Sequence, residues 1–179
     1  MILNIFLVFL TFIFLFATVV FTWITLTLFR THVPPIPTGK KRVLEMLQLT
    51  SPKEGDLFID LGCGFGDVLF LAEKNFSVRI IGYELSWPIA FVARLRKFFQ
   101  SSRVQIVRKD FYKVLFNNAD IVFTYLWPTH MERIEKEIWP QLKTGSRLVS
   151  CAFPFPNIKP STVQKIGQSN VYLYVKDKA

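Results

Sequence analysis

The chain has 179 residues, a length that fits one domain of ordinary size with room for one additional segment, so a second full domain is not expected. Lys and Arg number 22 against 13 Asp and Glu, and the formal net charge of +9 favours anionic surroundings, either lipid headgroups or nucleic acid. Cys63 and Cys151 are too few for a disulfide framework and indicate a reducing compartment, while the isolated His32 and His130 offer no zinc spacing.

Residues 1–29 predict a membrane-spanning helix, because they contain no charged side chain and are dominated by Phe, Leu, Ile and Val. The stretch exceeds the roughly 20 apolar residues that cross a bilayer core, and the basic n-region and small-residue cleavage site of a signal peptide are not visible. No basic residue precedes the stretch. The basic residues that follow it are Arg30, Lys40, Lys41 and Arg42. The positive-inside rule then predicts a single-pass protein with its C-terminal part in the cytoplasm or the equivalent organellar space.

Four threonines, Thr11, Thr18, Thr22 and Thr25, fall on one face of this helix. They could form a polar seam for a partner helix, but we favour hydroxyls bonded to carbonyls of their own preceding turn.

Residues 30–41 form a basic, proline-rich linker, in which Pro34, Pro35 and Pro37 forbid a continuing helix. The linker keeps the following domain near the bilayer, where basic residues would lie among anionic headgroups. Part of the net charge is then explained without nucleic acid. Thr38 could cap the helix that follows.

Residues 42–179 alternate between helical and strand-like runs, which predicts a parallel sheet with crossover helices. The expected helices are 42–49, 67–75, 86–100 and 128–142. The expected strands are 56–62, 78–84, 104–110, 119–127, 147–153 and 170–176, the last as an antiparallel edge strand. Together these elements predict one doubly wound, Rossmann-like α/β domain.

The glycines Gly62, Gly64 and Gly66 lie on the first strand-to-helix turn, the usual ligand-binding position of an open α/β sheet. A triphosphate is disfavoured, because Gly66 is followed by Asp67 instead of the Lys-Ser/Thr pair of a Walker loop. Asp60 would repel a pyrophosphate, whereas it would attract the sulfonium and ammonium of S-adenosyl-L-methionine. The turn therefore favours S-adenosylmethionine over a nucleotide.

Two further acids follow the next two expected strands. Glu84, at the end of the second strand, is suitably placed to accept both hydroxyls of a ribose. Asp110, at the end of the third, could accept from the exocyclic amine of adenine or be a solvated loop acid, and Phe111 could stack on the ring. Cys63, between two glycines, is most simply a small buried residue.

These residues resemble class I, seven-β-strand S-adenosylmethionine-dependent methyltransferases. Within that class the chain resembles the membrane-anchored protein lysine methyltransferases of the ATP synthase c-subunit and the adenine nucleotide translocase, with their bacterial relatives. The resemblance runs from the linker to about residue 160 and rests on VPPIPT, DLGCGFG, GYEL, RKDFYK, VFTYLWP and VSCAFPFPNIKP. It implies that Thr38 closes over the cofactor. Relatives often carry other residue types at Phe65, Asp67 and Ser86, and the tail after Pro160 is short for the final hairpin of the class.

The segment TYLWP, residues 124–128, is the candidate acceptor site. Strand alternation puts Tyr125 and Trp127 on one face, where they could form an aromatic wall for a lysine stem and ammonium, or else be core aromatics. The segment lacks the Asn/Asp-Pro-Pro signature of nucleobase amino-methyltransferases, which makes a nucleic acid substrate unlikely.

The leading hypothesis is a membrane-tethered protein lysine N-methyltransferase whose substrate is an integral membrane protein, with the ATP synthase c-subunit as a candidate by resemblance. A tether raises the effective concentration of the enzyme toward membrane substrates. Two alternatives stay open: a methyltransferase of a lipid or lipophilic small molecule such as a quinone, and a membrane-bound cofactor-binding module without turnover.

Overall fold

The computed structural model of the chain describes residues 2–31 and 39–177. The chain divides into two compact units, Met1–Pro34 and Pro35–Ala179.

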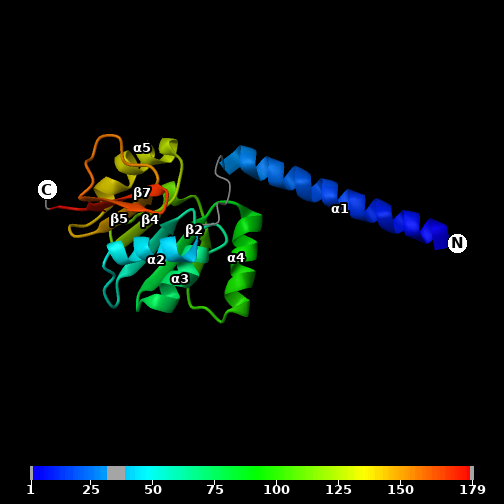
Figure 1. Ribbon diagram of the computed structural model, residues 1–179, viewed down its shortest axis with the longest axis horizontal. Coiled ribbons are helices and arrows are strands. Elements are labelled where there is room, and N and C mark those ends of the chain that lie inside the picture. The colour runs from blue at the N-terminus through cyan, green and yellow to red at the C-terminus, as the bar shows by residue number, and fades with distance from the viewer. Residues whose placement is uncertain (1, 32–38, 178–179) are drawn as a thin grey trace. The chain divides into compact units, whose positions relative to one another are not determined.

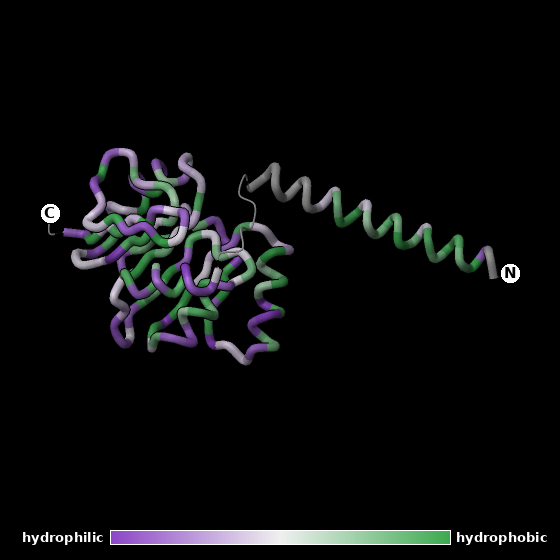
Figure 2. Tube along the Cα trace, in the orientation of Figure 1, coloured by the Kyte–Doolittle hydropathy of each residue, from purple (hydrophilic) through white to green (hydrophobic). Residues whose placement is uncertain are grey.

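The first unit contains helix α1 (Ile2–Thr31), which extends slightly beyond the expected apolar stretch (Figure 1). Its segment Asn4–Trp23 is long and apolar enough to cross a membrane, judged by length and composition, and Figure 2 shows hydrophobic residues along it. The hydroxyls of Thr11 and Thr18 donate to carbonyl oxygens of the preceding turn of the same helix. These two threonines therefore bond locally, as favoured from the sequence.

The second unit is built on a sheet of seven strands. They are β1 (Leu57–Leu61), β2 (Arg79–Glu84), β3 (Gln105–Arg108), β4 (Ile121–Thr124), β5 (Arg147–Cys151), β6 (Thr162–Ile166) and β7 (Ser169–Val175). The order across the sheet is β3-β2-β1-β4-β5-β7-β6. Strands β1 to β5 pair in parallel, whereas β7 is antiparallel to both β5 and β6. The doubly wound fold is confirmed.

Two strand predictions were wrong in detail. Strand β7 is antiparallel as expected, but it lies between β5 and β6, so β6 is the edge. The tail after Pro160 is long enough for the final hairpin, which turns at Gly167, where φ is +63°. Strand β4 ends at Thr124, earlier than expected, because the chain leaves the sheet before Pro128 starts the next helix.

Four α-helices and two short 3-10 helices pack on this sheet in the described part of the second unit. They are α2 (Lys40–Leu49), α3 (Asp67–Asn75), α4 (Trp87–Phe99), α5 (Pro128–Glu137), η1 (Phe111–Lys113) and η2 (Trp139–Gln141). Helices α2, α3 and α4 pack their buried residues with Phe58 and Phe123, which project from one face of the sheet. Helix α5 covers the other face, where Met131 contacts Ser150 (Figure 1).

The close packing of α3 on the sheet depends on a strand glycine. An ideal Cβ on Gly82 of β2 would lie 2.5 Å from Cδ1 of Leu69 and 2.7 Å from Sγ of Cys63. Both neighbours are buried, so neither has room to move aside. The missing side chain therefore lets α3 and the turn before it approach β2, which fixes the position of the glycine loop.

Candidate cofactor and active site

The glycine loop between β1 and α3 has the conformation that only glycine adopts easily. Gly62, Gly64 and Gly66 have φ values of +79°, +54° and +85°. The N–H groups of Gly62 and Cys63 both donate to the carbonyl of Tyr83 at 2.9 Å, so the loop is bound to the end of β2. Apart from its chain neighbours, no described residue has a heavy atom within 4 Å of an ideal Cβ on Gly64, so this part of the loop faces open space that a ligand can enter.

Glu84 joins the loop to the start of α4. One carboxylate oxygen accepts the N–H of Gly64 at 3.0 Å, and the other accepts the N–H of Ser86 at 2.8 Å. Burial raises the pKa of Glu84, and these two backbone bonds oppose that rise. Each oxygen keeps a second lone pair, which suits a carboxylate expected to accept two ribose hydroxyls. Ser86 is the N-cap residue of α4, and its hydroxyl makes no capping hydrogen bond.

Asp60, at the end of β1, is a buried acid whose charge is not compensated by its described neighbours. It is 3% exposed, and no residue in the described ranges donates a hydrogen bond to its carboxylate. Burial, followed by repulsion from Glu84, raises its pKa to about 8. A carboxylate held without a partner is a site that a ligand cation would stabilise.

Arg96 of α4 fixes the far side of the glycine loop, a contact that the sequence did not predict. Its guanidinium donates to the carbonyl of Phe65 at 2.8 Å and to the carboxylate of Asp67 at 2.7 Å. The same group lies over the ring of Phe70, with 5.4 Å between Cζ and the centroid. The loop is therefore held by β2 on one side and by α4 on the other.

The third strand end has a different arrangement. Asp110 accepts the N–H of Tyr112 at 3.0 Å and caps the short helix η1, while Phe111 is buried. The Tyr112 hydroxyl forms a hydrogen bond with Nδ1 of His130 at 2.9 Å. Cζ of Arg133 lies over the Tyr112 ring, 3.6 Å from the ring centroid. Burial raises the pKa of Tyr112 to about 12. One oxygen of Asp110 is thus used in a local hydrogen bond.

The two candidate acceptor residues differ in environment. Tyr125 is partly buried and packs against the core cluster that includes Cys151, so its ring has a structural role. Trp127 is 43% exposed and stacks on Phe153, with ring centroids 6.2 Å apart and an interplanar angle of 18°. Because β4 ends before them, strand alternation no longer decides their direction. An exposed Trp127 nevertheless follows β4, stacked on the half-buried Phe153 that follows β5.

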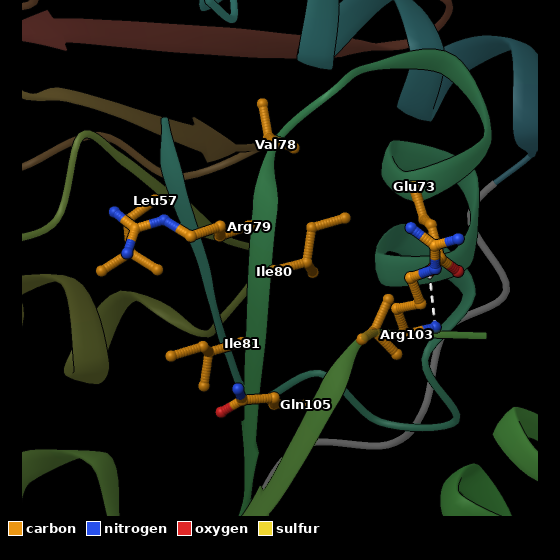
Figure 3. Close-up of a pocket in the computed structure, with 9 residues that line it drawn as sticks. Leu57, Glu73, Val78, Arg79, Ile80, Ile81, Arg103 and Gln105 are labelled. Carbon is orange, nitrogen blue, oxygen red and sulfur yellow. Dashed lines mark hydrogen bonds between the residues drawn. The ribbon is translucent and has the colours of Figure 1, made fainter. Parts of the chain in front are cut away.

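A cavity of about 370 Å³ lies away from this site, at the opposite ends of β1, β2 and β3. Figure 3 shows Arg79, Ile80 and Gln105 around it, with the backbone N–H of Arg103 bonded to the carboxylate of Glu73.

Within the described ranges no group of three or more His, Cys, Asp or Glu side chains could hold a metal ion. Thr38, the remaining candidate, lies outside the described residues.

The residues at the carboxyl ends of β1 and β2 fit S-adenosylmethionine. Asp60 suits its cationic groups, Glu84 suits its ribose, and the loop at Gly64 is open to a ligand. A doubly wound seven-stranded sheet that ends in an antiparallel hairpin, together with this cradle, defines an S-adenosylmethionine-dependent methyltransferase. The chain is thus an enzyme of the methyltransferase class.

Comparison with known proteins gives the family. The family model described as "ANTKMT methyltransferase domain" matches residues 60–162, and the chain belongs to that family. A protein-lysine N-methyltransferase from Saccharolobus islandicus is 32% identical over 80% of this chain and 94% of its own length. The lysine N-methyltransferase of the ATP synthase c-subunit from Xenopus laevis is 28% identical over 80% of this chain. This chain spans 62% of the length of the Xenopus protein.

A solved structure confirms the fold and the cofactor. The crystal structure of an RNA methyltransferase from Salinibacter ruber, in complex with S-adenosyl-L-homocysteine, superimposes with a TM-score of 0.76 at 25% identity. The match covers 80% of this chain and 95% of that chain. The predicted class, fold and cofactor are therefore confirmed.

Proposed function

We propose that this chain is a protein-lysine N-methyltransferase that acts, from a membrane tether, on a lysine of an integral membrane protein. The similarity to named lysine methyltransferases supports the acceptor class. The observation that carries the proposal is the exposed Trp127, which follows β4, the neighbour of the strand that carries Asp60, and stacks on Phe153. The ATP synthase c-subunit, the substrate named for the Xenopus relative, is the first candidate.

The cofactor is held by the residues at the ends of the first three strands. Asp60 pairs with the cationic groups, the free lone pairs of Glu84 accept the ribose hydroxyls, and the loop backbone at Gly62, Gly64 and Gly66 contacts the ligand without side-chain obstruction. Near the adenine, Phe111 stacks and Asp110 accepts from the exocyclic amine. Thr38 closes over the cofactor from the linker.

Bound S-adenosylmethionine would supply a methyl group from its positively charged sulfur, and the sulfur would become part of a neutral thioether. The protein must present a neutral lysine amine in line with that methyl and exclude water, so no dedicated base is required. The lysine ammonium loses its proton to solvent before transfer. Trp127 forms the wall along which the lysine stem lies, Tyr125 anchors the same segment in the core, and cation–π attraction helps to recruit the ammonium form.

The domain organisation supports the choice of a membrane substrate. Residues 1–29 are the transmembrane anchor, residues 30–41 the linker, and residues 42–179 the catalytic domain. The basic residues that follow the anchor put this domain on the cytoplasmic side or the equivalent organellar side. A tether raises the effective concentration of the enzyme toward proteins of the same bilayer and does little for soluble ones.

The test is transfer of label in native membranes. Membranes that contain the full-length protein or its Asp60→Ala variant receive tritiated S-adenosylmethionine, and label is counted separately in protein, lipid and nucleic acid. We expect label in a small membrane protein, recovered as methyllysine after hydrolysis and absent with the variant. Label confined to lipid would refute the lysine assignment and leave the methyltransferase class intact.

A second variant tests the acceptor wall. Trp127→Ala should raise KM for the membrane substrate by about 2- to 30-fold, the equivalent of about 0.5–2 kcal/mol for a lost cation–π contact. Its affinity for S-adenosylmethionine should stay unchanged. Val163→Ala is the matched control, because Val163 is another exposed apolar residue and lies on the edge strand β6, three strands from β4. Equal KM values for the two variants would contradict a role for Trp127 in binding the acceptor.

A further inference from the structure

Helix α4 is apolar on two faces. Its inner face packs on the sheet through Ile89, Ala90 and Ala93, which are all buried. A helix on the surface of a soluble domain normally presents charged and polar residues on its opposite face. In α4 that outer face presents large apolar side chains instead.

The outer stripe is defined by Trp87, Phe91, Leu95 and Phe98, at successive spacings of four, four and three residues that keep them on one side of the helix. Phe91 is 53% exposed and Phe98 is 76% exposed. The rings of Trp87 and Phe91 stack with centroids 5.7 Å apart, so these two form a continuous apolar surface. Figure 2 shows hydrophobic residues near both ends of α4, with hydrophilic residues between them. An exposed apolar stripe of this size marks an interaction surface.

The chain around this stripe is strongly basic. Between Glu84 and Asp110 it carries six cations and no acid, and the cations are Arg94, Arg96, Lys97, Arg103, Arg108 and Lys109. Helix α4 packs on the edge strand β3, so these cations belong to one flank of the second unit (Figure 1). Among the described residues, Arg96 is the member of this set that forms an ion pair, with Asp67. Arg94 donates to the carbonyl of Ile106, so the flank combines aromatic side chains with a net positive charge.

We propose that the outer stripe of α4 inserts into the headgroup region of an anionic bilayer and docks the catalytic domain on the membrane surface. Aromatic side chains on one face with Lys and Arg beside them are typical of helices that lie in the membrane interface. This inference rests on the proposed membrane attachment and adds a second, independent contact to it.

The length of the linker allows this docking. Eight residues, 32–39, separate α1 from α2, and even a fully extended chain of that length spans only about 30 Å. A domain on so short a tether needs little intrinsic affinity for lipid, because the tether supplies a high effective concentration. A short basic apolar helix, too weak to hold a free domain on lipid, is sufficient here.

Charge favours the bilayer over a second copy of the chain. A twofold contact through the stripe would bring the six cations of one flank against the same six of its partner, which is repulsive. An anionic lipid surface attracts these cations instead and neutralises their charge.

The docking also restricts the substrate. Trp87 follows Glu84, the ribose-binding candidate, by three residues, so the stripe begins at the edge of the sheet where the cofactor is bound. A domain docked through this stripe presents its active site at the level of the lipid headgroups. The favoured acceptor is then a lysine at the membrane interface, not one on a long soluble loop.

Nitroxide labels on the full-length protein in vesicles test the docking. Cys63 and Cys151 are both buried, so an introduced surface cysteine is labelled selectively. Phe91→Cys and Phe98→Cys place labels on the stripe, and Glu132→Cys, on the polar surface of α5, is the control. The measurement compares relaxation by oxygen, which concentrates in lipid, with relaxation by a water-soluble nickel chelate. One protein per vesicle removes contacts between copies.

We expect the ratio of oxygen to nickel accessibility at positions 91 and 98 to exceed that at 132 severalfold in vesicles containing phosphatidylserine, and to fall in phosphatidylcholine vesicles. Ratios equal to that at 132 would overturn the proposal. Shielding of both stripe labels from oxygen and nickel alike would also overturn it, because it signals a protein contact. The measurement does not depend on methyl transfer, so failure of the docking and failure of the lysine assignment are distinguishable.

Discussion

Replacing Asp60 by Asn tests whether the buried carboxylate binds the cofactor through its charge. Burial raises the pKa of Asp60 to about 8, so at neutral pH most of the free enzyme carries a protonated Asp60. The cationic groups of S-adenosylmethionine favour the ionised form, and binding then has to expel the proton. Affinity should therefore rise with pH until Asp60 is ionised.

The size of the effect follows from the ionised fraction. With a pKa near 8, about one molecule in a hundred is ionised at pH 6 and about half at pH 8. Since apparent affinity scales with the competent fraction, the dissociation constant should fall by about 50-fold between these pH values. Asp60→Asn should remove this pH dependence and bind weakly throughout.

Isothermal titration calorimetry at pH 6, 7 and 8 gives the affinity, and buffers of different ionisation enthalpy count the protons released. Titration of groups on the ligand is common to both proteins, so the ratio of their affinities isolates Asp60. Glu54→Gln is the control, because it removes one exposed negative charge. Its affinity for S-adenosylmethionine should change with pH as the affinity of the wild type does. If the affinities of the wild type and of Asp60→Asn changed with pH by the same factor, the reasoning would be refuted.

Asp60→Asn should also change the stability of the cofactor-free protein, and here we expect a gain where cofactor affinity shows a loss. Its pKa is higher in the folded protein than the value of 3.8 for an unperturbed Asp, so the folded state binds the proton more tightly. Its contribution to stability is then present below about pH 4 and is lost as the pH rises toward about 8. Without cofactor, Asp60→Asn should therefore have a higher Tm than the wild type at pH 8, even though it binds the cofactor more weakly.

Further variants test the packing and the loop. Gly82→Ala would put its Cβ 2.5 Å from Leu69, so we expect it to lower the free energy of unfolding by about 1–3 kcal/mol in urea titrations, whereas Gln48→Ala, at an exposed position of α2, should change it by less than about 0.5 kcal/mol. Equal stability of these two variants would contradict the close approach of α3 to β2. Arg96→Gln removes the bond to the Phe65 carbonyl, and we expect an S-adenosylmethionine affinity reduced by about tenfold, the equivalent of about 1.4 kcal/mol, with the Tm little changed. Unchanged affinity by calorimetry would show that the loop keeps its geometry without Arg96.

Much of the fold could be predicted from local patterns. Helix α3 occupies Asp67–Asn75, the predicted range, because the glycine loop fixes where it begins. Strand β6 was missed, since only Ile166 of its residues is buried and the segment shows no apolar alternation. It becomes a strand by pairing with β7, and that pairing is not visible in the segment itself.

The site was predictable where residues follow strand ends and unpredictable where distant residues meet. Asp60 and Glu84 follow successive parallel strands, and adjacent strands bring them to one edge of the sheet. Arg96 reaches Phe65, 31 positions earlier in the chain, through the packing of α4, which leaves no local signal. Trp127 was placed by strand alternation, and that argument failed because β4 ends at Thr124.

Cofactor binding and membrane docking share one helix, and this sharing predicts that they are coupled. Arg96 lies on α4 and fixes the glycine loop, while Phe91 and Phe98 lie on the outer stripe of the same helix. Docking that restrains α4 restrains the guanidinium that holds the Phe65 carbonyl, so S-adenosylmethionine should bind more tightly in anionic vesicles than in neutral detergent. Coupling between sites is reciprocal, and the cofactor should raise the lipid exposure of the nitroxide at position 98 by the same free energy. Equal cofactor affinities in the two environments, together with full insertion of the stripe, would show that α4 docks as a rigid body without transmitting strain to the loop.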